Sequence, residues 1–236
     1  MPESVSQFGE DLVVLEYFGQ KRQGFFLEVG ANDPVKFSQT WLLEQHGWQG
    51  ALVEPLSARC ERLRAGRPGS RVFQVAVGGP DSCGETTLHV TEDDMFSSLL
   101  TRAKGPQTTG SEKVRVVTLD DVMCDLGWPH LDFMSIDVEG LEIDVMRGFN
   151  LEKARPKLLL MEDHMKDLRL HRHLWGRGYR LLKRTGCNNW YVPKGAKPLP
   201  TTSSERFALR RRIWLNTPWA VVRAKLRAVR CGILGK

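Results

Sequence analysis

The sequence lacks closely spaced cysteines. Its five cysteines are far apart and none belongs to a Cys-x-x-Cys motif. Zinc sites and dense disulfide frameworks depend on such spacing, so we expect neither and predict reduced thiols.

Long apolar runs are also missing. No stretch of the sequence approaches the roughly 18 apolar residues that a membrane-spanning helix needs. Residues 1–7 contain neither the basic nor the apolar segment of a secretory signal. We therefore expect a cytoplasmic protein, either free or attached to the surface of a membrane.

The excess of positive charge is confined to one end of the chain. The net charge is +6, but residues 205–236 hold nine Lys and Arg residues and one acidic residue. The rest of the chain is slightly acidic, with 25 basic and 27 acidic groups. A nucleic-acid partner is therefore not expected, because its binding requires a basic surface.

Length and composition indicate one folded domain with an appendage. The chain has 236 residues, of which 41% are hydrophobic and 26% charged, as in an ordinary globular protein. We predict a domain over residues 1–197, a Pro- and Ser-containing linker over 198–204 and a basic amphipathic tail over 205–236.

Short apolar runs alternate with helical patterns, which predicts a mostly parallel sheet. The expected strands are residues 24–30, 50–54, 71–77, 131–137 and 157–162. A helix that starts at a Ser6 cap precedes them, and an inserted hairpin and loop over 80–118 interrupts them. Residues 179–184 and 189–193 predict an antiparallel hairpin at the sheet edge, since Pro193 does not suit a central strand.

The first strand ends in Glu28-Val-Gly30-Ala-Asn32-Asp33. This turn lacks the three spaced glycines that let a backbone approach the pyrophosphate of a dinucleotide, which argues against a nicotinamide-dependent oxidoreductase. S-adenosylmethionine has no phosphate and needs only one close backbone approach. The turn therefore favours that cofactor, although such a glycine also occurs in other α/β proteins.

An acidic residue ends the second strand. Glu54 follows Glu28 by 26 residues, near the position at which Rossmann folds place an acceptor for ribose hydroxyls. We predict that Glu54 binds the ribose. The alternative is an exposed loop residue before Pro55.

Two further strands carry polar groups to the same edge of the sheet. Asp137 and Glu139 follow one strand, and Glu162 and His164 follow the next. Ligands bind at this edge in open α/β sheets, so we predict a catalytic rim formed by these four residues. His164 is the expected base, and Asp137, Glu162 and His164 are the expected ligands if a divalent metal is used. We interpret two nearby acids as a solvated helix face: Glu142 and Asp144.

Taken together, these segments resemble the FkbM family of methyltransferases. The resemblance rests on Ser6-Gln-x-Gly-Glu-Asp11, Phe26-Leu-Glu-Val-Gly-Ala-Asn-Asp33, Ser38-x-Thr40, Gly47-Trp-x-Gly-x-Leu-Val-Glu-Pro55, Ala76-Val-Gly78, Thr118-Leu-Asp120 and Ile136-Asp-Val-Glu-Gly-x-Glu142. It covers roughly residues 6–195 and leaves the tail outside.

The resemblance implies a Rossmann-like class I methyltransferase fold, with a mostly parallel seven-stranded sheet and an antiparallel edge hairpin. It also implies S-adenosylmethionine as methyl donor and O-methylation of a hydroxyl on a sugar, polysaccharide or polyketide-type acceptor. It does not identify the acceptor. The residues expected to bind the cofactor are Glu28, Gly30, Asn32, Asp33, Glu54 and Ala76. A non-catalytic carbohydrate- or membrane-binding module on the same fold stays an alternative, because fold alone does not prove activity.

The basic tail has an amphipathic pattern of its own. Thr217 and Pro218 predict the start of a helix, and the apolar residues of that helix recur at three- and four-residue spacing. The apolar positions are Trp219, Val222, Leu226, Val229 and Ile233, and the basic positions are Arg223, Lys225, Arg227 and Arg230. We predict attachment to an anionic membrane surface or to a partner subunit, with packing onto the core of the protein as the alternative.

Overall fold

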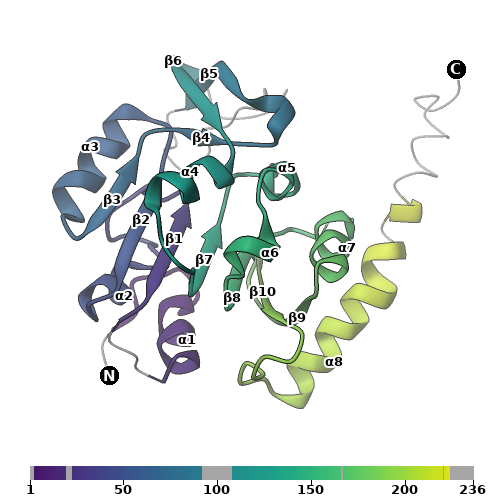
Figure 1. Ribbon diagram of the computed structural model, residues 1–236. Coiled ribbons are helices and arrows are strands. Elements are labelled where there is room, and N and C mark those ends of the chain that lie inside the picture. Colours follow the sequence, from purple (N-terminus) through teal and green to yellow (C-terminus); the bar gives the residue numbers. More distant parts are fainter. Residues whose placement is uncertain (1–2, 20–22, 92–107, 166, 220, 224–236) are drawn as a thin grey trace, which may run out of the picture.

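A computed structural model describes residues 3–19, 23–91, 108–165, 167–219 and 221–223 of the chain. Its centre is a seven-stranded sheet in the order β3-β2-β1-β7-β8-β10-β9 (Figure 1). The first five strands of this order run parallel, and β10 is antiparallel to both neighbours. The strands are β1 (Phe25–Val29), β2 (Gln49–Val53), β3 (Ser70–Phe73), β7 (Phe133–Ile136), β8 (Leu158–Glu162), β9 (Tyr179–Thr185) and β10 (Asn188–Pro193). The predicted mostly parallel α/β fold is confirmed.

Helices cover both faces of the sheet and make a three-layer domain. Alternate residues of each strand point to opposite faces, so each strand feeds two apolar clusters. One face packs on α1 (Glu10–Tyr17), α2 (Trp41–Gln45) and α3 (Ser57–Gly66). The other packs on α4 (Leu119–Leu126), α5 (Glu142–Arg147), α6 (Leu151–Ala154) and α7 (Arg169–Gly176).

A second, three-stranded sheet stands beside the carboxyl ends of the main strands. It has the order β4-β6-β5, with β4 (Ala76–Val77), β5 (Gly84–Thr91) and β6 (Thr108–Val117). Strands β5 and β6 form the predicted inserted hairpin, and a 3-10 turn, η1 (Pro80–Ser82), precedes them. The single strand predicted over 71–77 is wrong: it is divided between the two sheets, as β3 and β4.

The edge hairpin has the predicted residues, but Pro193 lies on its inner strand. Strand β10 lies between β8 and β9, so β9 is the edge. Pairing of β10 with β8 ends at Tyr191, and Pro193 pairs only with Tyr179 of β9. The proline is tolerated because it lies beyond the part of β10 that has two neighbours.

The first helix begins later than predicted. It starts at Glu10 after Gly9, which has a φ of 77°, and Ser6 is not its cap. The hydroxyl of Ser6 instead donates to the Asp11 carboxylate at 2.9 Å, and Ser6 forms a β-bridge with Phe37. This segment is thereby held against the loop that follows β1.

The tail forms a helix earlier than predicted. Helix α8 (Ser203–Arg211) begins inside the expected linker at a capping box made by Thr202 and Glu205, and a wide helical turn, η3 (Arg212–Asn216), continues it. Thr217 has helical angles of −68° and −49°, so a helix start at Thr217 is wrong. The predicted apolar positions Leu226, Val229 and Ile233 and the predicted basic positions Lys225, Arg227 and Arg230 lie outside the described residues. Among those residues no helix combines the length and the apolarity needed to cross a bilayer.

Candidate active site

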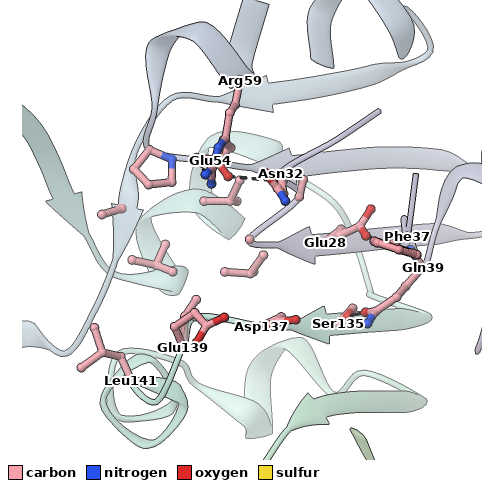
Figure 2. A pocket seen from close by; sticks show the side chains of 18 of the residues that line it. Glu28, Asn32, Phe37, Gln39, Glu54, Arg59, Ser135, Asp137, Glu139 and Leu141 are labelled. Carbon is pink, nitrogen blue, oxygen red and sulfur yellow. Dashed lines mark hydrogen bonds and ion pairs between the residues drawn. The ribbon is translucent and has the colours of Figure 1, made fainter. Parts of the chain in front are cut away.

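A pocket opens at the carboxyl ends of β1, β2 and β7, beside the small sheet. In Figure 2, Glu54 and Asn32 lie on one side of it and Asp137 and Glu139 on the other. Five of the six residues predicted to bind the cofactor line this pocket: Glu28, Gly30, Asn32, Glu54 and Ala76. The sixth, Asp33, is not among its lining residues. Its carboxylate accepts the backbone N–H groups of Val35 and Lys36 at 2.9 and 2.7 Å and shapes the loop after β1.

Gly30 forms the floor of the pocket where β1 meets β7. Its φ of 82° lies in the left-handed region that favours glycine. A β-carbon at this position would overlap the carbonyl oxygen of Asp137. The glycine is therefore required for the close approach of two backbone segments, as well as for room above the turn.

Glu54 is a buried carboxylate in the pocket wall, with 2% of its surface exposed. It accepts the backbone N–H groups of Asn32 at 3.3 Å and Leu56 at 3.0 Å, and it lies 3.7 Å from the guanidinium of Arg59. Burial raises the pKa of Glu54, an effect that Arg59 and the two N–H groups partly offset. The exposed-loop alternative for this residue is therefore wrong.

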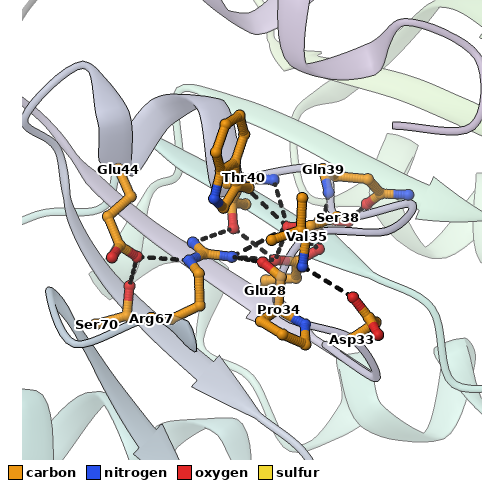
Figure 3. A network of polar contacts seen from close by, with 12 residues as sticks. Glu28, Asp33, Pro34, Val35, Ser38, Gln39, Thr40, Glu44, Arg67 and Ser70 are labelled. Carbon is orange, nitrogen blue, oxygen red and sulfur yellow. Dashed lines mark hydrogen bonds and ion pairs between the residues drawn. The ribbon is translucent and has the colours of Figure 1, made fainter. Parts of the chain in front are cut away.

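Glu28 is held by the segment that precedes α2 (Figure 3). Its carboxylate accepts hydrogen bonds from the hydroxyls of Ser38 and Thr40 at 3.0 and 2.5 Å, and from the backbone N–H of Gln39 at 2.9 Å. These contacts explain the Ser38-x-Thr40 motif. They aim Gln39 at the pocket, which it lines, and place its side chain in contact with the Ser135 hydroxyl.

Arg67 completes this network, and no pattern in the sequence indicated its role. The side chain is fully buried, and its guanidinium donates to Glu44 at 2.6 Å, Ser38 at 3.1 Å and Thr40 at 3.1 Å. Glu28 lies 3.9 Å away. Figure 3 shows the guanidinium between the two carboxylates. A buried cation is stable only with such partners, so the network fixes the pocket wall from behind.

The carboxyl groups of Asp137 and Glu162 lie together at the ends of β7 and β8, close enough for a hydrogen bond between them. Burial and the negative charges of Glu162, Glu139 and Glu142 raise the pKa of Asp137 well above its ordinary value. Carboxylate oxygens of three residues, Asp137, Glu139 and Glu162, all lie within 4.8 Å of one another. A proton shared between carboxylates reduces the repulsion of such a group, and so would a divalent cation.

The four predicted rim residues are divided between two pockets. Asp137 and Glu139 line the first pocket, whereas Glu162 and His164 line a second one beside it. The Nε2 atom of His164 lies 3.3 Å from Glu162, and 58% of the histidine side chain is exposed. The Asp137–Glu162 contact therefore joins the two pockets.

The interpretation of Glu142 as part of a solvated face is wrong, whereas Asp144 is partly exposed. Glu142 is 7% exposed, lines the second pocket and accepts the backbone N–H of Gly140 at 2.9 Å. Asp144 accepts the backbone N–H of Gly79 at 3.0 Å, which lowers its pKa and ties α5 to the small sheet. Both carboxylates therefore hold backbone N–H groups near the site.

Three pocket residues besides Gly30 have left-handed backbone angles, among them Asn32 (φ 45°) and Glu139 (φ 54°). A third such residue, Phe37 (φ 64°), also lines the pocket and is 43% exposed. Strain of this kind is concentrated at functional sites. Phe37 could not be predicted as a pocket residue, since nothing in its local sequence pattern predicts such an angle for an aromatic residue.

Comparison with known proteins identifies the family of the chain. Residues 28–181 match the family model described as "Methyltransferase FkbM domain". The match covers more than half of the chain, so the chain is a methyltransferase, and its fold is of the Rossmann-like α/β class. It belongs to the FkbM methyltransferase family. None of the curated proteins compared with the chain matches it.

Several solved methyltransferase structures are similar in outline. An O-methyltransferase from Bacillus cereus in complex with SAH is 13% identical, with a TM-score of 0.46 over 82% of this chain and 84% of the other. A putative O-methyltransferase from Klebsiella pneumoniae is 11% identical, with a TM-score of 0.45 over 82% and 83%. A TehB-like SAM-dependent methyltransferase from Corynebacterium glutamicum is 9% identical, with a TM-score of 0.42 over 80% and 89%.

Proposed function

We propose that the protein is an O-methyltransferase that binds S-adenosylmethionine in the first pocket and a hydroxyl-bearing acceptor at the second. One observation carries the proposal: Asp137 lines the donor pocket and is also hydrogen-bonded to Glu162, which lines the neighbouring pocket. Methyl transfer to oxygen requires donor and acceptor to meet in line, and two adjoining pockets with a shared wall suit that requirement.

The residues of the first pocket fit the parts of S-adenosylmethionine. Glu54 is a buried acceptor suited to the ribose hydroxyls, and Gly30 leaves room for a close backbone approach. The carboxylates of Asp137 and Glu139 suit the positive charges of the amino acid end. An apolar wall suits the adenine and comprises Val53, Val75, Val77 and Leu88. When bound, the cofactor supplies a methyl group on a sulfonium.

The second pocket supplies a group that can take the proton of the acceptor. In the proposed reaction a bond forms between the acceptor oxygen and the methyl carbon, the carbon–sulfur bond breaks, and the hydroxyl proton passes to His164. Glu162, 3.3 Å from Nε2, orients the imidazole and balances the charge that it gains. Neutral S-adenosylhomocysteine and the methylated acceptor leave.

A divalent cation is the second route to the same chemistry. Asp137, Glu139 and Glu162 offer oxygen ligands within 4.8 Å of one another, and such ligands suit Mg²⁺ or Mn²⁺. A cation there would lower the pKa of the acceptor hydroxyl and replace the base. The ligand set differs from the one expected from the sequence, because Glu139 is in the cluster and His164 is not.

The acceptor class that we propose is a hydroxyl of a sugar, polysaccharide or polyketide-type molecule. The family resemblance supports this class. The slightly acidic body of the chain disfavours a nucleic acid.

Calorimetry and an acceptor screen test the proposal. S-adenosylhomocysteine should bind with a 1:1 stoichiometry, and NAD should not bind. Oligosaccharides and hydroxylated natural products incubated with methyl-labelled donor should yield a labelled ether. A labelled methyl group attached to nitrogen or carbon of the product contradicts O-methylation. Absence of S-adenosylhomocysteine binding favours a non-catalytic binding module.

A further inference from the structure

The helical tail presents large apolar side chains to solvent. Phe207 is 70% exposed, Trp214 76%, Leu215 63% and Trp219 60%. Val222 follows at 45%. Phe207, Leu215, Trp219 and Val222 are separated by eight, four and three residues, so they recur along one side of a helix. We call these five residues the apolar tail face.

The opposite side of the tail is fixed to the body of the protein. Leu209 is buried, and Glu205 forms an ion pair with Lys183 of β9 at 3.3 Å. Further along, the guanidinium of Arg212 donates to the carbonyl oxygen of His164 at 3.3 Å. Figure 1 shows α8 in yellow next to β9, outside the layers that enclose the main sheet. Helix α8 and the turn η3 are therefore docked on the body of the protein, and among the described residues no layer covers their outer face.

Basic side chains flank the apolar tail face. Arg206, Arg210, Arg211 and Arg223 are exposed, and Glu205 is the one acidic residue of the tail. A core-packing helix would bury its tryptophans, and a merely solvated helix would not carry two of them. Aromatic and aliphatic residues between arginines are the composition of a helix that lies in the surface of an anionic bilayer.

We propose that the apolar tail face and its arginines attach the enzyme to an anionic membrane surface. The tryptophans and Phe207 would enter the region between headgroups and acyl chains, while the arginines pair with lipid phosphates. The charge favours this occupant, because four exposed arginines beside a single acidic residue match a continuous anionic surface, whereas a protein partner would have to supply a matching set of acidic residues.

Membrane attachment does not depend on the proposed function. Only its consequence for the acceptor, given next, rests on the proposed reaction. Arg212 contacts His164, which lines the second pocket, so the tail is in contact with a residue of the proposed acceptor site. A membrane bound by the tail would lie near that pocket, which suits acceptor hydroxyls carried on lipid-linked molecules.

Sedimentation of the full chain with vesicles tests the attachment without any assay of methyl transfer. Vesicles of phosphatidylcholine with phosphatidylglycerol should bind the protein, and vesicles of phosphatidylcholine alone should bind it at least about tenfold more weakly. The double variant W214S/W219S should lose about tenfold or more in affinity, and so should R210Q/R211Q. All four side chains are exposed, so the fold should be unchanged.

Matched variants outside the tail test whether vesicle binding depends on the tail itself or on any exposed tryptophan or basic residue. Trp175 on α7 is 52% exposed, and Lys113 and Arg115 are exposed on β6. W175S and K113Q/R115Q should bind anionic vesicles like the parent. The proposal is overturned if the parent ignores anionic vesicles, or if the tail and control variants lose binding equally. It is also overturned if W214S/W219S abolishes a concentration-dependent dimer while vesicle binding is absent. Failure of the acceptor screen would leave vesicle binding unaffected.

Discussion

Gly30 and Asp137 directly follow two neighbouring parallel strands, β1 and β7, and a β-carbon on Gly30 would overlap the carbonyl oxygen of Asp137. The strand pairing brings them together: the N–H of Asp137 donates to the carbonyl of Val29 at 3.0 Å. The floor of the first pocket is therefore main chain, and it leaves no space for a side chain at position 30.

Replacing Gly30 with alanine should damage both the fold and the donor pocket. The left-handed φ alone costs an alanine about 1–2 kcal/mol, and the overlap with Asp137 adds to that cost. We expect a lower unfolding midpoint in urea and loss of S-adenosylhomocysteine binding in calorimetry. Gly195 is the matched control, because its φ is 87° and a β-carbon there meets nothing within 4 Å. Equal losses in G30A and G195A would contradict the role of the close approach.

Glu54→Ala should weaken S-adenosylhomocysteine binding by about 1–3 kcal/mol, the usual loss when a buried acceptor is removed. The carboxylate also holds the N–H groups of Asn32 and Leu56, so part of the effect passes through the loop after β1. Circular dichroism and thermal unfolding of the variant show whether the fold is intact. An intact variant with parental affinity would mean that Glu54 does not bind the ribose.

Asp137 should make the protein less stable as the pH rises. Burial and neighbouring carboxylates raise its pKa in the folded state, so the folded protein holds this proton more tightly than the unfolded chain. The stabilisation is present at acidic pH and is lost as the pH rises from about 4 through the raised pKa. Asp137→Asn keeps a donor for Glu162 without the titration. Its melting temperature should therefore fall less than that of the parent between about pH 5 and pH 9.

Asp144 provides a control of opposite sign. The Gly79 N–H lowers its pKa, so its stabilisation is present at neutral pH and is lost as the pH falls through that lowered value. Asp144→Asn should be less stable than the parent at neutral pH and equally stable in acid. If Asp137→Asn behaved in the same way, the shared proton between Asp137 and Glu162 would be excluded.

The main strands and the edge that carries the site could be predicted from the sequence because both depend on local patterns. Apolar runs ending in Gly30, Glu54 and Asp137 indicated three strand ends, and parallel strands bring such ends to one edge. The small sheet was harder: Phe73 and Ala76 belong to one continuous β-like run, and only tertiary pairing divides it between two sheets.

Long-range partners account for what the sequence did not predict. Arg67 follows a helix-ending glycine and looks like a surface residue, yet Glu28 and Glu44 surround it from segments 39 and 23 residues away. Glu142 has the local pattern of an exposed first helical turn, but its carboxylate turns back to the N–H of Gly140. Burial of a charge is decided by partners that a local pattern does not contain.

His164→Ala separates the two proposed routes for the hydroxyl proton. A positioned base contributes about 10²–10⁴-fold to the rate, so the variant should lose that much turnover while its affinity for S-adenosylhomocysteine stays unchanged. His130 is the matched control: its Nε2 lies 3.3 Å from the carboxylate of Asp132, the same separation as between His164 and Glu162, but next to the amino end of β7. His130→Ala should therefore retain parental turnover. Turnover measured with and without EDTA completes the test. Loss in H164A without an effect of the chelator supports the base, whereas a chelator-sensitive enzyme that tolerates H164A requires the carboxylates of Asp137, Glu139 and Glu162 to act through a cation.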